Sequence, residues 1–240
     1  MSATTHRPTT DFDTGVHMTL VERYARMAHA YEPRDVDRVL RAFDVVLAGS
    51  ALAVLSPIVG LAALAIRLSG RGPVLYRGRR VGRGGRVFTM YKFRTLKPDA
   101  EQRLAPYYGP ELTVRTRNEV SRVGRVLRAT KIDELPQLFN VLRGDMSLVG
   151  PRPIRPTFFE QLSEEIPAYW QRLVVAPGAT GLAQLRLTRE MTWAEKLAHD
   201  FEYIADRSVR LYFAVLLATA WLIVRLPFSA VLRRARGMSD

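Results

Sequence analysis

Cysteine is absent from this chain of 240 residues, and acidic residues are scarcer than basic ones. Without cysteine the protein has no disulfide, no thiolate metal site and no cysteine nucleophile. The spacing typical of metal ligands is also missing among the four histidines, which are His6, His17, His29 and His199. The 36 lysines and arginines exceed the 23 aspartates and glutamates, giving a net charge of +13. Such an excess favours an anionic partner: nucleic acid, acidic lipid headgroups or a phosphorylated substrate.

The N-terminal segment lacks the apolar core of a secretory signal, because residues 1–17 are polar. Residues 1–35 are expected to form a polar tail with one candidate interfacial helix, Met18–Tyr31, whose apolar residues have helical spacing. Neither an internal repeat nor a low-complexity linker divides the remainder. Residues 36–240 are therefore expected to form one domain with membrane-bound edges.

A long apolar run without charge extends from Val45 to Ile66. As a helix rising about 1.5 Å per residue, it is long enough to cross a bilayer core of about 30 Å. Ser56 and Pro57 lie at its midpoint, where proline removes a helical hydrogen bond and the serine hydroxyl can satisfy the freed backbone. Basic residues flank both ends, so the positive-inside rule favours the cytoplasm for both. The residues alone favour a kinked span, with a helix–break–helix hairpin as the alternative.

A second membrane signal lies near the C-terminus. The apolar segment Leu211–Val224 is too short to span a bilayer, and basic and apolar residues alternate after it. This combination is typical of a helix lying among anionic headgroups, here over about residues 208–236. A buried core helix with a basic tail is an equally open alternative.

Two short runs with β character, joined by the glycine-rich turn GRGG, follow the first apolar segment in GPVLYRGRRVGRGGRVFTMYKFRT. They predict a small β-hairpin. This region is unusually basic, with Arg77, Arg79, Arg80, Arg83, Arg86, Lys92 and Arg94. A solvated basic face near anionic lipid is the simpler interpretation. Binding of a pyrophosphate by some of these side chains is the functional one.

The stretch TKIDELPQL places two carboxylates, Asp133 and Glu134, side by side. Because Pro136 is tolerated only in the first turn of a helix, Asp133 is expected to be the N-cap of the helix that follows. The helix dipole at that position favours ionised carboxylates and also attracts phosphate. An ordinary N-cap explains Asp133. Alternatively, Arg128, Arg143 and Arg152 nearby in the chain would balance an anionic ligand placed against the pair.

A loop punctuated by proline and glycine, VAPGATGLAQL, lies further along the chain. Such a loop permits close backbone approach to a ligand, or serves simply as a connecting turn. The candidate ligand-contacting residues in it are Pro177, Gly178, Thr180 and Gly181.

Several of these segments together match one family. The chain resembles the monotopic bacterial sugar transferases, the polyprenyl-phosphate phosphoglycosyl transferases, over roughly residues 38–220. The resemblance is carried by the apolar segment interrupted at Ser56 and Pro57, and by GPVLYRGRRVGRGGRVFTMYKFRTL, LRATKIDELPQLFNVLRGDMSLVGPRP, PGATGLAQL and HDFEYIADRSVRLYFAVLL. The segments occur in the family's order, and the middle block is long and specific.

The resemblance implies a mixed α/β, mainly helical fold in a monotopic membrane protein on the cytoplasmic face of the bacterial inner membrane. It implies a re-entrant helix hairpin over about residues 38–67 in place of the kinked span. A catalytic part over about residues 72–210 and interfacial amphipathic helices in contact with anionic lipids complete the expected domain. Residues 1–35 are not expected to supply the multi-span domain that larger members of the family carry.

The resemblance also implies a reaction. A phosphosugar moves from a UDP-sugar to undecaprenyl phosphate, with Mg²⁺ as cofactor and UMP as product, in the first membrane step of glycan assembly. By position, Asp133 is the nucleophile that forms a covalent phosphosugar intermediate, and the metal ligand, with Glu134 as its partner. The residues expected at the substrate phosphates are Lys92, Arg94, Arg128 and Arg152. Two positions depart from the family's pattern: Thr95 replaces a frequent serine, and Tyr212 an expected aspartate.

Two other classes of function are alternatives. A membrane-tethered nucleic-acid-binding protein would use the positive charge. However, no stacking aromatics are interleaved with the basic run, so no nucleic-acid partner is expected. A catalytically silent membrane scaffold with the same fold is the other alternative. The sequence does not indicate the sugar, the glycan pathway or whether the chain forms a homo-oligomer.

Overall fold

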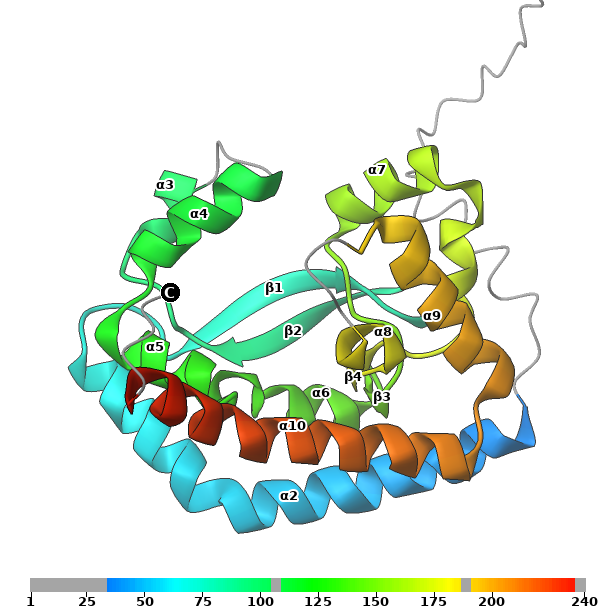
Figure 1. Cartoon of the computed structure of the whole chain (residues 1–240), viewed down its shortest axis with the longest axis horizontal. Coiled ribbons are helices and arrows are strands. Elements are labelled where there is room, and N and C mark those ends of the chain that lie inside the picture. The colour runs from blue at the N-terminus through cyan, green and yellow to red at the C-terminus, as the bar shows by residue number, and fades with distance from the viewer. Residues whose placement is uncertain (1–33, 105–108, 187–190, 236–240) are drawn as a thin grey trace, which may run out of the picture.

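Helices make up most of the chain in the computed structural model, which describes residues 34–104, 109–186 and 191–235 (Figure 1). The α-helices are α2 (Asp35–Leu68), α3 (Ala100–Leu104), α4 (Gly109–Glu119), α5 (Arg122–Ala129), α6 (Gln137–Arg143), α7 (Pro156–Glu165), α8 (Leu182–Leu185), α9 (Trp193–Asp206) and α10 (Val209–Ala235). The 3₁₀ helices are η1 (Arg83–Gly85), η2 (Ile132–Glu134) and η3 (Pro167–Val174), and the strands are β1 (Leu75–Val81), β2 (Val87–Phe93), β3 (Ser147–Val149) and β4 (Gly178–Thr180). The predicted mixed α/β, mainly helical fold is confirmed. The expected helix Met18–Tyr31 lies outside the described residues.

The long helix α2 contains the predicted apolar segment and is long and apolar enough to cross a membrane. The chain stays helical through Ser56 and Pro57, which corrects the predicted helix–break–helix, although Figure 1 shows that α2 bends along its length. Pro57 has no N–H to donate to the carbonyl of Ala53. The Ser56 hydroxyl donates to that carbonyl instead, at 2.8 Å, so the backbone is satisfied and the helix continues. Re-entry into the same side of a membrane stays a prediction.

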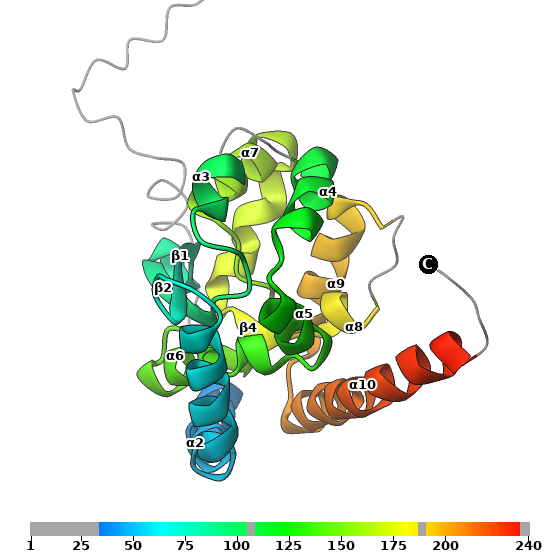
Figure 2. The ribbon, with the colours of Figure 1, turned by 90° about the vertical axis from the view of Figure 1, so that its left-hand side faces the viewer.

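Helices α2 and α10 lie on the same side of the molecule, with α4 and α7 on the opposite side in both views (Figures 1 and 2). Both helices expose large apolar side chains, including Val54 and Leu61 on α2 and Leu217 and Trp221 on α10. The predicted C-terminal helix is therefore confirmed as a helix, but a fully buried core helix is excluded. Contiguous exposed apolar faces of this size are typical of a surface that contacts a membrane or another protein.

A buried carboxylate in α2 joins the two helices to the rest of the chain. Asp44 is only 3% exposed. One of its oxygens accepts hydrogen bonds from the Ser147 hydroxyl at 3.0 Å, the Leu148 amide at 2.8 Å and the Tyr212 hydroxyl at 2.8 Å. Buried carboxylates are tolerated when their oxygens receive such bonds. Tyr212, the departure from the family's pattern, is thus the partner from α10 in this network.

The β-hairpin predicted from its glycine-rich turn is confirmed. Strands β1 and β2 pair antiparallel from Leu75 opposite Phe93 to Val81 opposite Val87. In the turn, Gly84 and Gly85 have φ of 60° and 73°, which glycine adopts without steric cost. The hairpin packs on α6 through Phe88 and Met90 of β2, which belong to one buried cluster with Ala48, Val141 and Met146.

Asn140 connects α6 to this hairpin from a position that is completely buried. Its side-chain oxygen accepts from the Tyr91 amide at 2.9 Å, and its nitrogen donates to the Thr89 carbonyl at 2.7 Å. The side chain therefore satisfies two backbone groups of β2. The next residue of this strand after Tyr91 is Lys92, which contributes to the site described below.

Substitution of Asn140 by alanine is expected to lower the free energy of unfolding by about 2–4 kcal/mol, because two buried backbone groups lose their partners. Thermal unfolding of the full chain in nanodiscs measures this as a fall in the melting temperature of several degrees. The exposed Asn118→Ala is the matched control and should melt like the parent. Equal melting temperatures for both variants would contradict this role of Asn140.

Candidate functional site

The two neighbouring carboxylates, Asp133 and Glu134, lie in the 3₁₀ turn η2 between α5 and α6. Helix α5 ends at Thr130, and Lys131 then adopts a left-handed conformation with φ of 60° that turns the chain into η2. The Leu135 amide donates to the Ile132 carbonyl at 3.1 Å, and Pro136 has no N–H with which to convert this turn into an α-helix.

The prediction that Asp133 is the N-cap of the following helix is therefore wrong. Helix α6 begins only at Gln137, and Asp133 lies one turn before it. Helix α6 ends at Arg143, and Gly144 follows it in the left-handed conformation, with φ of 84°. The carboxylates consequently owe their environment to neighbouring side chains from other elements rather than to a capping position.

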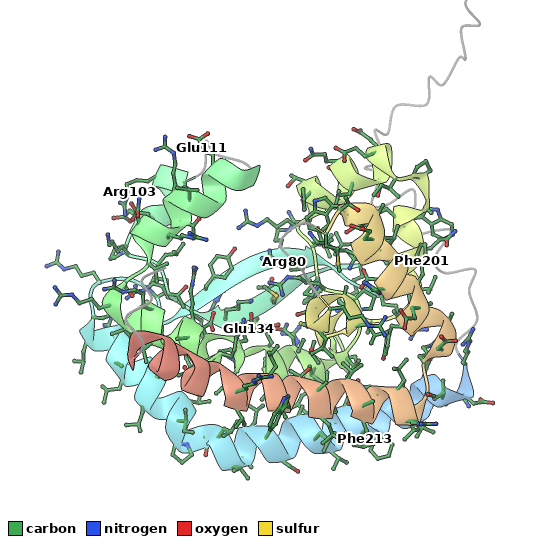
Figure 3. All side chains as sticks on the ribbon, in the orientation of Figure 1. Arg80, Arg103, Glu111, Glu134, Phe201 and Phe213 are labelled. Carbon is green, nitrogen blue, oxygen red and sulfur yellow. The ribbon has the colours of Figure 1, made fainter. Side chains whose placement is uncertain are left out.

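Glu134 forms an ion pair with Lys92 of β2, with 2.7 Å between Lys92 Nζ and Glu134 Oε1 (Figure 3). Burial alone would raise the pKa of Glu134. The Lys92 ammonium opposes this effect by its charge and its hydrogen bond, and together with the charges of Lys131 and Arg152 it brings the pKa below its ordinary value. Glu134 is therefore held as a carboxylate at neutral pH.

Asp133 is buried, with 8% of its surface exposed, and among the described residues its Oδ1 has no hydrogen-bond partner. Burial is the largest cause of a raised pKa at Asp133, and the charge of Glu134 raises it further. Lys92, Lys131 and Arg128 oppose the rise. The sequence predicted that a helix dipole would stabilise the ionised form of Asp133. The raised pKa shows that the surroundings of Asp133 favour the protonated form instead. The carboxylate is more basic than an exposed aspartate and has a free acceptor atom.

Four residues were predicted to bind the substrate phosphates, and two of them in addition to Lys92 act on the Asp133–Glu134 pair. Arg128, at the end of α5, lowers the pKa of Asp133 by its charge and donates through Nε to the Thr95 hydroxyl at 2.9 Å. The side chain of Arg152, between β3 and α7, acts by its charge on Glu134 and donates to Gln184 Oε1 at 3.1 Å. Thr95 therefore supplies the hydroxyl that orients Arg128.

The structure does not bring Arg94 together with the carboxylates. Its guanidinium donates to the carbonyl of Arg71 at 2.7 Å, that of Gly70 at 3.0 Å and that of Ile66 at 3.3 Å. These are backbone groups at and just beyond the end of α2. The geometry favours an anchor for that end of α2 over contact with a substrate.

The glycines of the PGATG loop are explained by packing between two backbones. Strand β4 pairs parallel with β3, and a Cβ atom at Gly178 would lie 2.0 Å from the Gly150 nitrogen. A Cβ atom at Gly181 would lie 2.3 Å from the Gly150 carbonyl oxygen. Together with the Gly178 amide bond to the Pro151 carbonyl at 2.9 Å, this packing holds the segment that carries Arg152. The contacts of Pro177, Gly178, Thr180 and Gly181 that the structure shows are therefore structural, including the hydroxyl pair of Thr180 and Thr219 at 2.7 Å.

Sequence reasoning missed Gln137, which is buried and whose Nε2 has no hydrogen-bond partner among the described residues. It follows Asp133 by one helical turn in TKIDELPQL, so its place in that block was the available signal. Within the described ranges no group of three or more His, Cys, Asp or Glu side chains is placed to hold a metal ion. Asp133 Oδ1 is the one buried carboxylate oxygen of the pair that lacks a hydrogen-bond partner among the described residues, whereas Glu134 Oε1 is paired with Lys92.

Comparison with known proteins identifies the family. A model of the family described as "Bacterial sugar transferase" matches residues 36–226. The UDP-N-acetylgalactosamine-undecaprenyl-phosphate N-acetylgalactosaminephosphotransferase of Aeromonas hydrophila is 40% identical over 184 residues, covering 75% of this chain and 42% of that protein. The UDP-glucose:undecaprenyl-phosphate glucose-1-phosphate transferase of Caulobacter vibrioides is 44% identical, covering 72% of this chain and 65% of that protein.

A relative of similar extent is the exopolysaccharide production protein PSS of Rhizobium leguminosarum. It is 39% identical over 193 residues, covering 77% of this chain and 94% of that protein. The chain spans less than two thirds of the Aeromonas and Caulobacter relatives but nearly the whole of this one.

Substitution of Asp133 by asparagine is expected to stabilise the fold at pH 7 to 8. The raised pKa means that the folded state favours the protonated carboxyl, so the ionised form lowers stability above the folded pKa. Removing the charge should add about 0.5–2 kcal/mol to the free energy of unfolding. The gain should shrink as the pH falls through the raised folded pKa, and it should be absent below about 3.9, where the carboxyl is protonated in both states.

Thermal unfolding of the parent and the variant between about pH 3.9 and pH 8 measures this difference in stability, and the exposed Asp206→Asn is the control. The control should stay within about 0.5 kcal/mol of the parent at every pH. A destabilised Asp133→Asn at pH 8 would show that the carboxylate is not strained in the folded state.

Proposed function

Because the chain belongs to the bacterial sugar transferase family, we propose that it transfers a sugar phosphate from a UDP-sugar to undecaprenyl phosphate and releases UMP. The names of two relatives describe transfer of a sugar phosphate to undecaprenyl phosphate, which supports the reaction class. The observation that carries the proposal is the buried Asp133, whose free and basic oxygen lies beside the Lys92–Glu134 pair. A nucleophile of this kind suits a phosphoanhydride, whose leaving group is a stable phosphate.

In the first step, the free Asp133 oxygen attacks the phosphorus that carries the sugar. A bond forms between carboxylate oxygen and phosphorus, and the phosphoanhydride bond breaks, so UMP leaves with the electron pair. In the second step, an oxygen of the lipid phosphate attacks the same phosphorus and displaces the Asp133 carboxylate. The product is a lipid diphosphate that carries the sugar, and the enzyme is regenerated.

The basic residues make this approach of anion to anion feasible. Lys92 compensates the charge of Glu134, and Arg128 lies close enough to Asp133 to lower its pKa. Both side chains, with Arg152, would stabilise charge on the transferred phosphoryl group. Glu134, as the ionised neighbour, keeps Asp133 basic and hence nucleophilic.

Magnesium fits the donor set as an ion shared with the substrate. Mg²⁺ prefers carboxylate oxygens and is commonly bound by one or two of them together with substrate phosphates. Asp133 Oδ1 is such an oxygen, whereas Glu134 Oε1 is occupied by Lys92. When bound, the ion would neutralise negative charge on the diphosphate.

The exposed apolar faces of α2 and α10 would hold the enzyme in the bacterial inner membrane, with the site on the cytoplasmic side. Basic residues around both ends of α2 favour anionic headgroups on one side of the membrane. This arrangement would bring the soluble UDP-sugar and the lipid phosphate to Asp133 at the same depth. The protein would then act in the first membrane step of the assembly of an exopolysaccharide or related glycan.

The full chain in nanodiscs with undecaprenyl phosphate is expected to release UMP from a UDP-sugar, and Asp133→Asn should lose more than about 10³-fold of this rate. With UDP-sugar labelled at the phosphate next to the sugar and no acceptor, the parent chain should retain label covalently and the variant should not. Asp206→Asn is the control and should behave like the parent. Release of UDP in place of UMP would identify a different reaction, and covalent label on Asp133→Asn would exclude this nucleophile.

Re-entry of α2 is tested with single cysteines, since the chain has none of its own. The exposed positions Arg38 and Arg71 lie on the two sides of the apolar segment. In a re-entrant arrangement, Arg38→Cys and Arg71→Cys should both resist an impermeant maleimide in intact spheroplasts and both react after lysis. Asp206→Cys in the catalytic part is the control for cytoplasmic exposure. Labelling of one of the two positions in intact spheroplasts would show a span.

A further inference from the structure

Two arginines from distant parts of the chain face each other across a short stretch of β-structure. The Val81 amide donates to the Ile154 carbonyl at 2.9 Å, and the two residues form an isolated antiparallel bridge. Arg80 directly precedes Val81 and Arg155 directly follows Ile154, and the charge of Arg155 acts on Arg80. Like charges brought this close are destabilising.

In the described part of the chain Arg80, Arg152 and Arg155 form no ion pair with an acidic side chain, although the charge of Arg152 acts on Glu134. Other arginines there do find acidic partners, as Arg172 does with Asp200 at 2.7 Å. The half-buried Arg80 donates to the Arg79 carbonyl at 2.7 Å and hydrogen-bonds with the Tyr76 side chain. Burial is the largest cause of a lowered pKa at Arg80, and the charges of Arg155 and Arg152 lower it further.

The local backbone is shaped to hold Arg80 in this position. Tyr76, Gly78 and Arg80 alternate along β1 and so share one face. A Cβ atom at Gly78 would lie 2.8 Å from the Tyr76 ring and 2.9 Å from an Arg80 guanidinium nitrogen. With glycine at this position the two side chains meet above the strand, and a larger residue would displace their ends.

This group of arginines is continuous with the reactive carboxylates. Tyr76 pairs directly with Lys92, so Arg80 lies on the face of the hairpin from which Lys92 reaches Glu134. Arg152 acts by its charge on Glu134 at one end and on Arg80 at the other. In the view of Figure 3, Arg80 and Glu134 both lie in the middle part of the molecule, between α4 and α9.

We propose that Arg80 and Arg155, together with Arg152, bind the phosphate that leaves with the nucleotide. This inference rests on the proposed function. The two phosphates of a UDP-sugar are adjacent. When the phosphate that carries the sugar lies at Asp133, the phosphate that carries the nucleoside would therefore lie beside it, towards the three arginines. Guanidinium groups bind phosphate oxygens bidentately, and their charge stabilises the negative charge that develops on UMP as the anhydride bond breaks. The phosphate of the lipid acceptor has the same chemistry and is the competing source.

Calorimetric titration of UMP and of uridine into the full chain in nanodiscs tests the assignment. Arg80→Gln and Arg155→Gln are each expected to raise the dissociation constant for UMP about 10- to 100-fold and leave that for uridine unchanged. Arg79→Gln removes the same charge from the exposed opposite face of β1 and should leave both constants unchanged. Equal UMP affinity in the parent, Arg80→Gln and Arg155→Gln would overturn the inference while leaving the proposed function intact. Absence of UMP binding and UMP release in the parent chain would overturn both.

Thermal unfolding without nucleotide separates a binding role from a structural one. Because the repulsion is relieved, Arg155→Gln should melt at the same temperature as the parent or higher, and should lose most of the stabilisation that UMP gives the parent. A lower melting temperature with an unchanged UMP-induced shift would show that Arg155 is structural. Steady-state kinetics then distinguish the lipid phosphate from the nucleotide phosphate as the ligand of this site. A raised KM for undecaprenyl phosphate alone, with unaltered UMP binding, would move the site to the lipid acceptor and overturn the assignment to the nucleotide.

Discussion

The ion pair between Lys92 and Glu134 is the interaction on which the candidate site depends. It joins the β-hairpin to the turn between α5 and α6 at 2.7 Å. It also keeps Glu134 ionised despite burial, and this fixed negative charge is one reason why the pKa of Asp133 is raised. A single contact therefore connects the position of the turn with the basicity of the neighbouring carboxylate. Asn140 supports it by binding the backbone of β2 directly before Lys92.

The same site is held from two further directions. Asp44 joins α2 to the backbone of β3 and to α10, so the surface that would contact lipid is tied to the strand leading to Arg152. The close packing of Gly150 against Gly178 and Gly181 then fixes that segment from the other side. Helices expected in a membrane and residues expected at a phosphate are thus parts of one buried framework. This explains how chemistry at Asp133 can occur at a defined depth.

Arginine serves two purposes in this protein, and the partners distinguish them. Arg94 and Arg172 are occupied by carbonyls or a carboxylate and hold elements together. The group of Arg80, Arg152 and Arg155 concentrates positive charge beside Glu134, and in our proposal this repulsion is relieved when an anion binds. Asp133, buried with a free oxygen, adds to this strain. Residues that lower stability without an evident structural gain are expected at functional sites.

Local features were predictable from the chain alone: the apolar length of α2, the glycine turn of the hairpin, the role of the Ser56 hydroxyl and the end of α6 at Gly144. These depend on proline, glycine and hydrophobic spacing, which act on nearest neighbours. Lys92 and Arg128, which the resemblance assigns to the substrate phosphates, act by their charge on Asp133, and Arg152 acts on Glu134; phosphate binding by these residues stays a prediction. The anchoring role of Arg94 and the approach of Arg155 to Arg80 were decided by tertiary contacts. Their partners lie far away in the chain, and no local pattern records which distant group will neutralise a given charge.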